Sequence, residues 1–489
     1  MNVGIRRVGI AVTVLLLLLV AQLTYLQVVD AKRLAHDPLN RRVALRDLRA
    51  PRGEIVSADN RVLARSVPSN DEYKLQRVYP FGELVAPVVG FQSIVVGSTG
   101  LERTYSSVLA GRGGSRLGFR DLADFIRGKT RVGNLITSLR VDAQLKAKEL
   151  LGNQRGSVVV IEPTTGAVVV MYSNPSFDPS PLAGHISRDV QQYFDLLSNA
   201  PDNPALSRAF REIYPPGSTF KVVTAASALD AGTVTLETAF PSRTSLTPPQ
   251  SSQPIANFGA SSCGGDLTTV FVRSCNTAFA QMGLDLGNDF VPRMAGFGVG
   301  EAPPLDVSPG AAVSTGPTAG SFDTNKPFFA LAGIGQGDVA TTPLQMALVA
   351  AGIANGGIVM EPHVGTAVRD DEGRLLTTIE PKVWKRAATP ATAATVRDLM
   401  IQVVNGRNGT GTAARLPGIT VAGKTGTAQT QPGEDPHAWF VAFAPAEAPR
   451  YAVAVIVEHG GNSGSEATGG RVAAPIARDL LEFLLQPQP

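Results

Sequence analysis

The amino-terminal run of apolar residues constrains this chain more than any other feature. No charged residue occurs between Val8 and Val29, and Leu15–Leu19 forms the centre of the run. Because a helix of about 20 apolar residues spans a bilayer, the sequence predicts one transmembrane helix within residues 1–30. Arg6 and Arg7 precede the run and a long segment follows it, which favours a signal anchor with the remaining chain outside the cytoplasm. A cleaved signal peptide is the alternative, although no small-x-small cleavage site ends the run.

Length and charge limit what the remaining chain can be. With 489 residues, we expect two folded units besides the anchor. The formal net charge of +3 comes from interspersed acids and bases, which argues against a nucleic-acid partner. Residues 31–140 are rich in arginine and contain short strand-like runs, so we expect an elongated α+β pedestal module there. Residues 141–489 are expected to form the second unit.

The second unit has the pattern of an α+β domain. Two runs of β-branched residues, 156–161 and 167–172, flank a turn at Glu162–Gly166 and predict a hairpin. We expect three later strands to complete a five-stranded antiparallel sheet with helices around it. These strands are predicted at 419–428, 438–444 and 451–458, and the helices at 141–151, 219–229, 267–282, 343–353 and 472–485.

The stretch Tyr214–Lys221 has the features of a nucleophile at the start of a helix. Two prolines and a glycine end the preceding segment, and apolar residues continue to Leu229. Ser218 is therefore predicted at a helix N-terminus, where free backbone N–H groups favour negative charge. Lys221 lies three positions later, on the same face. The pattern indicates an activated serine. A second interpretation stays open at this point, with Ser218 as a helix cap and Lys221 as a solvated charge.

Two further motifs follow in order along the chain. Ser274-Cys275-Asn276 lies in a predicted helix, and Lys424-Thr425-Gly426-Thr427 lies in a predicted strand. The ordered set of Ser-x-x-Lys, Ser-x-Asn and Lys-Thr-Gly is the signature of serine β-lactamases and penicillin-binding proteins, which this chain resembles. One departure is Cys275, because β-lactamases usually carry aspartate at that position.

The resemblance implies catalytic roles for five side chains. Lys221, made neutral by burial and by neighbouring Lys424, is expected to take the proton of Ser218. Ser274 is expected to relay a proton between Lys221 and a leaving amine. Asn276 is expected to hold both Lys221 and an amide of the substrate.

The strand motif is expected to bind substrate. Lys424, Thr425 and Thr427 suit the carboxylate of a peptide, and Gly426 is expected to let that peptide approach the strand closely. The backbone N–H groups of Ser218 and Thr427 are expected to form the oxyanion hole.

A wider set of motifs resembles class B penicillin-binding proteins, closest to the short actinobacterial penicillin-binding protein A type. It covers nearly the whole chain and comprises Arg52–Ile55, Gly100–Glu102, Tyr214–Lys221, Gly335–Gly337, Thr342–Gln345 and Lys424–Ala428. The resemblance implies a penicillin-binding transpeptidase fold. It also implies a peptidoglycan D,D-transpeptidase that forms an acyl-enzyme on Ser218, is inhibited by β-lactams and serves cell-wall synthesis during growth or division.

The implied partners are peptidoglycan stem peptides, β-lactam antibiotics and a membrane glycan polymerase. The implied location is the cell membrane, crossed once, with the catalytic domain extracytoplasmic. Two alternatives are a hydrolase of the same acyl-enzyme, such as a D,D-carboxypeptidase or β-lactamase, and a mainly non-catalytic activator of the polymerase.

The sequence indicates neither a metal nor a cofactor. Cys263 and Cys275 are the only cysteines and have no histidine near them in sequence, so a zinc site is not expected. In an oxidising compartment they form either a disulfide or two free thiols. The glycine run Gly333–Asp338 lacks the Gly-Lys-Ser/Thr ending of a phosphate-binding loop.

Overall fold

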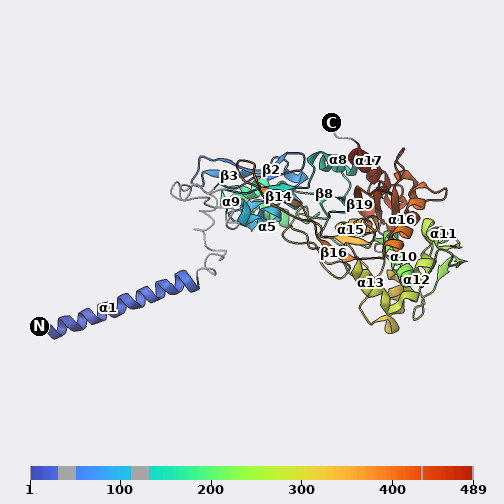
Figure 1. Ribbon diagram of the computed structural model, residues 1–489, viewed down its shortest axis with the longest axis horizontal. Helices are drawn as coiled ribbons and strands as arrows, with labels where there is room; N and C mark the ends of the chain where they lie inside the picture. Colours follow the sequence, from blue (N-terminus) through green and yellow to red (C-terminus); the bar gives the residue numbers. More distant parts are fainter. Residues whose placement is uncertain (1, 31–50, 112–131, 431–432, 487–489) are drawn as a thin grey trace.

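The computed structural model describes residues 2–30, 51–111, 132–430 and 433–486. At one end lies the apolar helix α1 (Asn2–Thr24), which continues into the π-helical turn η1 (Tyr25–Val29) (Figure 1). The segment Gly4–Val28 is long and apolar enough to cross a membrane, and none of it is buried against the protein. This helix fits the membrane anchor that the sequence predicts.

A five-stranded antiparallel sheet forms the centre of the larger unit, as predicted. Its strand order is β17-β18-β19-β7-β8, so the hairpin that comes first in sequence lies beside the last strand. The strands are β7 (Gly156–Ile161), β8 (Val168–Asn174), β17 (Ala422–Ala428), β18 (His437–Ala444) and β19 (Tyr451–Val457). This order leaves β17 at an edge, with one side free of strand partners.

Helices cover both faces of this sheet. α8 (Val141–Leu151) and the closing helix α17 (Ala473–Leu485) lie against each other on one face. On the other face, α15 (Pro343–Ala354) packs against β7, β18 and β19, and α16 (Pro390–Asn405) packs against β17.

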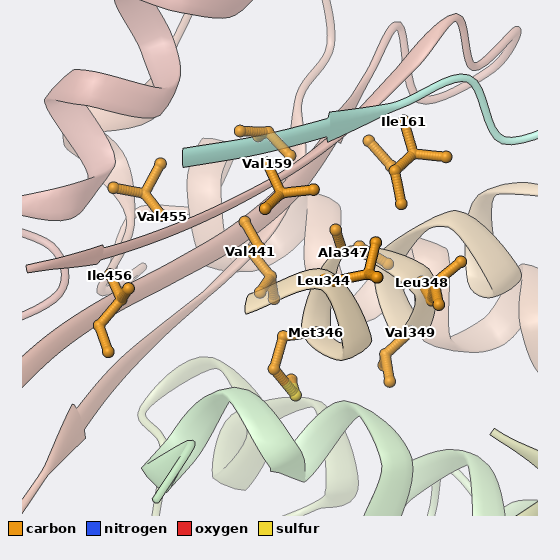
Figure 2. Close-up of a cluster of buried hydrophobic side chains, with 14 of the residues drawn as sticks. Val159, Ile161, Leu344, Met346, Ala347, Leu348, Val349, Val441, Val455 and Ile456 are labelled. Atoms are coloured by element: carbon orange, nitrogen blue, oxygen red, sulfur yellow. The ribbon is translucent and has the colours of Figure 1, made fainter. Parts of the chain in front are cut away.

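Helix α15 is buried on all sides, which explains its nearly uninterrupted apolar sequence. Figure 2 shows Leu344 and Ala347 near the sheet residues Val159 and Val441, while Met346 points the other way, toward the neighbouring helices. Full burial of a side chain such as Leu344 contributes about 1.5–3 kcal/mol. α15 therefore joins the sheet to the helices beyond it.

Beyond α15 lies a group of helices that begins with the 3-10 turn η4 (Gly217–Phe220). The helices are α10 (Lys221–Asp230), α11 (Leu267–Val272), α12 (Asn276–Leu286), α13 (Phe290–Gly296) and α14 (Lys326–Ala332). α10 contacts α12, α13 and α16, so it is enclosed by other helices.

The prediction of one continuous helix over 267–282 is wrong. The chain leaves the helix after Val272, passes through Ser274 with a φ of 58°, and starts α12 at Asn276. The N–H of Cys275 bonds to the carbonyl of Val270 at 2.9 Å, closing the first helix as a left-handed cap does. Both helices bury apolar residues, so the hydrophobic pattern in the sequence continues across the break between them. The pattern therefore does not show where the first helix ends.

Other short elements complete the chain. Further helices are α4 (Ala86–Val89), α5 (Gly100–Thr104), α6 (Ser106–Leu109) and α9 (Ser187–Ser198). Two-stranded pairs are β4 (Gln92–Ser93) with β5 (Gly97–Ser98), β9 (Phe240–Arg243) with β12 (Cys263–Gly265), β10 (Ser245–Leu246) with β11 (Ile255–Ala256), and β13 (Ile358–Met360) with β16 (Val383–Arg386).

The pedestal is built on a six-stranded mixed sheet. The order is β15-β14-β6-β1-β2-β3, and only the pair of β1 and β6 is parallel. The strands are β1 (Ile55–Val56), β2 (Val62–Pro68), β3 (Leu75–Val78), β6 (Asn134–Thr137), β14 (Gly365–Arg369) and β15 (Leu375–Thr378). Two of the six strands therefore come from far later in the chain, and Figure 1 places β14 among the early strands.

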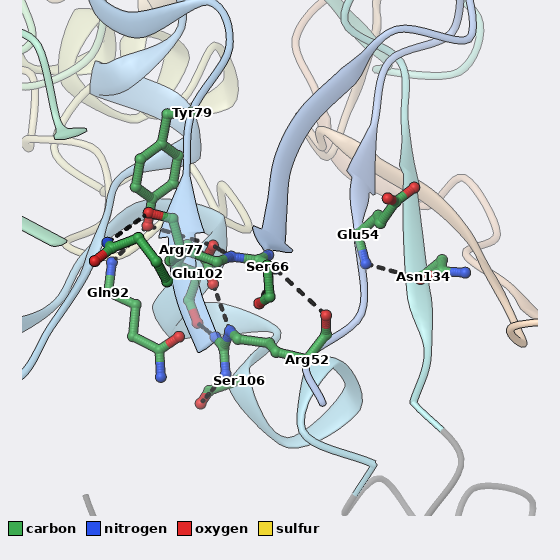
Figure 3. A network of polar contacts seen from close by, with 10 residues as sticks. Arg52, Glu54, Ser66, Arg77, Tyr79, Gln92, Glu102, Ser106 and Asn134 are labelled. Atoms are coloured by element: carbon green, nitrogen blue, oxygen red, sulfur yellow. Dashed lines mark hydrogen bonds and ion pairs between the residues drawn. The ribbon is translucent and has the colours of Figure 1, made fainter. Parts of the chain in front are cut away.

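A buried ionic network joins the two pedestal motifs (Figure 3). The carboxylate of Glu102 is fully buried and accepts hydrogen bonds from Arg52 Nε at 2.7 Å and Arg77 Nε at 2.6 Å. Arg52 Nη2 also donates to the Glu102 carbonyl at 2.7 Å. Two cations therefore converge on one anion, and removing the anion leaves both without compensation.

We predict that Glu102→Gln lowers the free energy of unfolding by about 3–5 kcal/mol, because it leaves two buried guanidinium groups without a counter-charge. Urea denaturation measures this loss. Glu149→Gln is the matched control, since Glu149 forms an exposed pair with Lys146 and is expected to contribute under about 1 kcal/mol. Equal losses in the two variants would contradict the prediction.

Candidate active site

Ser218 lies in the turn that precedes α10. Gly217 has a φ of 53°, and its N–H bonds to the carbonyl of Gly335 at 2.9 Å. A Cβ atom at position 217 would come within 2.7 Å of the Thr427 carbonyl oxygen, so glycine there lets the turn lie directly against β17. Ser218 is half-buried, and its Oγ makes no hydrogen bond within the part of the chain that the structure describes. The hydroxyl is thus free to react.

Lys221 lies one turn later, fully buried, and contacts the second motif. Its Nζ lies 2.7 Å from Asn276 Oδ1, 2.8 Å from the Ser274 carbonyl oxygen and 3.1 Å from Ser274 Oγ. Asn276 Nδ2 donates to the Ala256 carbonyl at 2.8 Å, which orients the amide oxygen toward Lys221. One amide hydrogen of Asn276 is thus used within the protein.

Lys424 reaches the same hydroxyl from β17. Its Nζ is fully buried, 3.0 Å from Ser274 Oγ and 3.1 Å from the Thr425 carbonyl oxygen. Burial lowers the pKa of Lys424 to about 7. Burial, and in addition the charge of Lys424, lowers the pKa of Lys221 well below its ordinary value. The site therefore holds two amines that lose their protons easily.

The hydrogen-bond partners of Lys221 fit a neutral amine. A neutral amine has two N–H bonds and one lone pair. The carbonyl oxygens of Ser274 and Asn276 can only accept, so they take the two hydrogens. The lone pair then faces hydroxyl groups, and Ser274 can donate to it while accepting from Lys424. This arrangement places an amine with an available lone pair one helical turn from Ser218.

The break between α11 and α12 gives Ser274 its orientation. With a φ of 58°, Ser274 presents both its carbonyl and its hydroxyl to Lys221. The next residue, Cys275, is bonded to Cys263 of β12, with the two Cα atoms 5.6 Å apart. The bond attaches the break to the neighbouring hairpin.

The strand motif lies along the edge of the sheet beside Ser218. Thr425 Oγ1 is 2.8 Å from Thr410 Oγ1, and Thr427 is half-buried. The structure adds a reason for glycine at position 426. A Cβ atom there would lie 2.8 Å from Thr219 Cγ2 and 2.9 Å from the Pro216 carbonyl oxygen, so glycine lets the turn that carries Ser218 lie against the strand.

Sequence reasoning missed the support behind β17. A Cβ atom at Gly469 would collide with the carbonyl oxygens of Trp439 and Gly426, so Gly469 lets the segment after β19 cover the strand motif. The doublet Gly469–Gly470 was the only sequence signal for this contact. Asn257 was also missed. Its side chain receives the N–H of Thr277 and fixes the loop next to Asn276.

Comparison with known proteins agrees with this geometry. Residues 156–482 match the penicillin binding protein transpeptidase domain, and residues 52–136 match the penicillin binding protein A dimerisation domain. The chain belongs to the penicillin-binding protein family. The family resemblance inferred from the three motifs and the pedestal motifs is confirmed, as is the fold class.

Similar family members span the whole chain. It is 42% identical to the peptidoglycan D,D-transpeptidase PbpA of Mycolicibacterium smegmatis, covering 99% of both chains. It is 41% identical to PbpA of Mycobacterium tuberculosis, covering 100% of both. The ceftriaxone acyl-enzyme complex of penicillin-binding protein A from M. tuberculosis superposes with a TM-score of 0.82 at 37% identity, covering 90% of this chain and 100% of that one.

Proposed function

We propose that this penicillin-binding protein is a peptidoglycan D,D-transpeptidase that forms an acyl-enzyme on Ser218 and is inhibited by β-lactams. The observation that carries the proposal is the cluster in which Lys221 and Lys424 share the hydroxyl of Ser274 beside the free hydroxyl of Ser218. Relatives named peptidoglycan D,D-transpeptidase and the acyl-enzyme structures support the same reaction.

In the acylation step, Ser218 Oγ attacks the carbonyl carbon of the penultimate D-alanine while neutral Lys221 takes the hydroxyl proton. The backbone N–H groups of Ser218 and Thr427 stabilise the negative oxygen of the tetrahedral intermediate. When the C–N bond breaks, the proton passes through Ser274 to the departing D-alanine amine. The product is an ester on Ser218.

In the second step, an amine from a neighbouring stem peptide attacks this ester. Lys221 takes one proton from the amine, a new amide bond forms, and Ser218 recovers its hydrogen. A β-lactam acylates Ser218 in the same way when its ring C–N bond opens, but its nitrogen stays attached to the acyl group.

Substrate binding is assigned to the edge strand. Lys424 supplies positive charge for the terminal carboxylate, and Thr425 and Thr427 supply hydrogen bonds to it. Asn276 keeps one amide hydrogen for a carbonyl of the substrate. Peptide backbone lying beside β17 adds a strand to the open edge of the sheet.

The membrane helix implies where this reaction takes place. Arg6 and Arg7 before the apolar run favour an amino terminus in the cytoplasm and a catalytic unit outside it. We further propose that the anchor and the pedestal bring the transpeptidase unit to a membrane glycan polymerase that makes the strands to be cross-linked. The pedestal comprises residues 31–140 together with β14 and β15, and the transpeptidase unit comprises the rest of residues 141–489.

Mass spectrometry after penicillin treatment tests the acyl-enzyme. The tryptic peptide that contains Ser218 should gain the mass of penicillin, and Ser218→Ala should gain none. Ser261→Ala, at an exposed serine near the site, is the matched control and should label fully. An unlabelled Ser218 peptide in folded protein would overturn the proposal.

The same protein separates transpeptidation from hydrolysis. Incubation with two stem peptides, one bearing a free acceptor amine, should give a cross-linked product by liquid chromatography. Release of D-alanine without that product would favour a carboxypeptidase.

We predict that Ser274→Gly slows acylation of Ser218 by penicillin about 10²-fold or more, because the proton relay is lost. The protein should stay folded, since the relief of the φ of 58° offsets part of the cost of the hydrogen bonds that Lys221 and Lys424 lose. Acylation kinetics and the melting temperature measure the two effects. Ser261→Gly makes the same substitution at an exposed serine and should acylate at the wild-type rate. If Ser274→Gly is slow but also unfolded, or is as fast as wild type, the proton relay is not supported.

A further inference from the structure

Two aromatic side chains hold the chain just before Ser218. Trp439 of β18 is fully buried, and its Nε1 donates to the carbonyl oxygen of Pro215 at 3.0 Å. Tyr214 is 5% exposed, and its hydroxyl donates to Glu458 Oε1 at 2.7 Å. Neither side chain has a part in the reaction described above. Both act on the residues that lead into the turn of the nucleophile.

Glu458 is a firmly held acceptor for Tyr214. Its carboxylate is buried and also accepts from Arg208 Nε at 2.7 Å and from Arg155 Nε at 3.1 Å. Burial, and next the charge of Glu458, raises the pKa of Tyr214 above its ordinary value, so the hydroxyl keeps its proton and stays a donor. A hydrogen bond to a charged acceptor is stronger than one between neutral groups. The hydroxyl end of Tyr214 is therefore fixed.

The two rings connect this segment to the strand motif. The ring of Tyr214 packs edge-on against His437, with ring centres 5.4 Å apart, and against Trp439, with ring centres 6.1 Å apart. His437 and Trp439 pair across the sheet with the two β17 residues that flank Thr427. The β18 residues that contact the segment before Ser218 are thus in fixed register with Thr427.

The placement of the turn relative to β17 matters for the oxyanion hole. In the proposed reaction one donor of the hole, the N–H of Ser218, lies on the turn and the other, the N–H of Thr427, lies on the strand. The two segments are in close contact, since a Cβ atom at Gly217 would come within 2.7 Å of the Thr427 carbonyl oxygen. Such donors act when they lie about 2.7–3.1 Å from the negative oxygen, and a misplacement of about 1 Å costs up to about 10²-fold in rate.

We propose that Trp439 and Tyr214 are positioning residues for acylation. By fixing the turn relative to β17, they set the spacing of the two backbone N–H groups of the oxyanion hole. The inference rests on the proposed function, because the hole acts only when Ser218 is acylated. Two backbone hydrogen bonds between Tyr214 and Thr341 hold the same segment independently. They remain when a side-chain donor is removed, so the segment stays in place but is less exactly positioned.

Tyr214→Phe and Trp439→Phe each remove one of these donors and keep an aromatic ring. Stopped-flow acylation at several penicillin concentrations separates the dissociation constant of the first complex from the rate constant of acylation. The rate constant should fall about tenfold or more in each variant. The dissociation constant should stay within about twofold of wild type, because the lost stabilisation belongs to the transition state alone. Weaker binding with an unchanged rate constant would overturn the proposal.

A boronic acid that carries the penicillin side chain tests the hole itself. Ser218 Oγ bonds to boron and its proton passes to Lys221, so the adduct is tetrahedral and has an oxygen where the substrate oxygen becomes negative. Its affinity should fall in each variant by about the same factor as the rate constant, since such an analogue loses what the transition state loses. Slower acylation with unchanged boronic-acid affinity would overturn the assignment to the oxyanion hole.

The chain offers a matched control for each variant. Tyr105→Phe removes a hydroxyl that donates to Asp306 Oδ2 at 2.6 Å, and Trp384→Phe removes an indole N–H that donates to Glu301 Oε1 at 3.3 Å. Tyr105 belongs to the pedestal and Trp384 to β16, so neither holds the turn or β17. Both controls should acylate at the wild-type rate. No fall in the variants, or an equal fall in variants and controls, would contradict the proposal.

Circular dichroism and the final extent of Ser218 labelling by penicillin are measured for every protein. Complete labelling of wild type tests the proposed function separately, so its failure is distinct from a failure of this inference. If one variant does not fold, the other still tests the proposal, because the two donors lie on different segments. If neither folds, the two donors hold the fold rather than the hole, and the proposal is wrong.

Discussion

Lys221→Met is expected to reduce the rate constant for acylation of Ser218 by penicillin about 10⁴-fold or more. Methionine has nearly the volume of lysine and suits the surroundings of Nζ, which lies 5.4 Å from the ring centre of Phe279. What is lost is the amine that lies next to Ser274 and one turn from Ser218. Without a base, the serine hydroxyl is a weak nucleophile, and the loss of one member of such a catalytic group removes most of the rate enhancement.

Stopped-flow measurement with a chromogenic β-lactam gives the rate constant. Lys148→Met is the matched control, because Lys148 is half-exposed on α8 and takes no part in the site. Circular dichroism establishes that both variants are folded. If Lys221→Met acylates within tenfold of the wild-type rate, another group must be the base.

The parts of the fold that follow local patterns were predictable. The strand over 156–161 and the helix over 141–151 have the predicted bounds, because β-branched runs and helical periodicity are local signals. Turns indicated the antiparallel pairing of β7 with β8, and of β17, β18 and β19 in succession. The expectation that both groups join in one sheet rested on the chain ends returning to one another, and the pair of β19 with β7 makes that join.

The parts that depend on distant contacts were not predictable. No local signal indicates that β14 joins β6, because this pairing links residues more than two hundred positions apart. The break at Ser274 was hidden because the apolar pattern continues from α11 into α12. Gly469 contacts the strand motif through its backbone alone. Such a contact does not affect the hydrophobic periodicity from which helices and strands are predicted.

The candidate site came from motifs, and the structure adds physical reasons. Motifs indicated Lys221, Ser274 and Lys424, but not that Ser274 lies between the two amines. They also suggested contact between Lys221 and Ser218, whereas Lys221 is hydrogen-bonded to the second motif and Ser218 Oγ has no partner in the described chain. The Ser218 hydroxyl is therefore left without a hydrogen-bond partner in the described chain, while the second motif holds the Lys221 amine in place.

Lys424→Met is expected to reduce acylation at pH 7 about 10³-fold and to move the acid limb of the pH–rate profile to higher pH. Part of the loss is the missing partner of the substrate carboxylate, about 10–100-fold. The remainder arises from Lys221. The charge of Lys424 helps to lower the pKa of Lys221, so its removal raises that pKa and leaves more of the base protonated. A variant with an unmoved acid limb would contradict this coupling.

Stability provides an independent check on Lys424. Its pKa falls from 10.5 to about 7 on folding, so below pH 7 both states carry the charge and the folded state bears the full cost of burying it. Between pH 7 and pH 10.5 Lys424 is protonated in the unfolded chain but not in the folded one, so the unfolded chain binds one proton more. The wild-type free energy of unfolding should therefore rise by about 1.4 kcal/mol per pH unit from this group. From pH 7 to 9 the free energy of unfolding of wild type should rise by about 2–3 kcal/mol more than that of Lys424→Met. Urea denaturation across this pH range measures both proteins. If the two free energies change in parallel, Lys424 is not a buried, easily deprotonated amine.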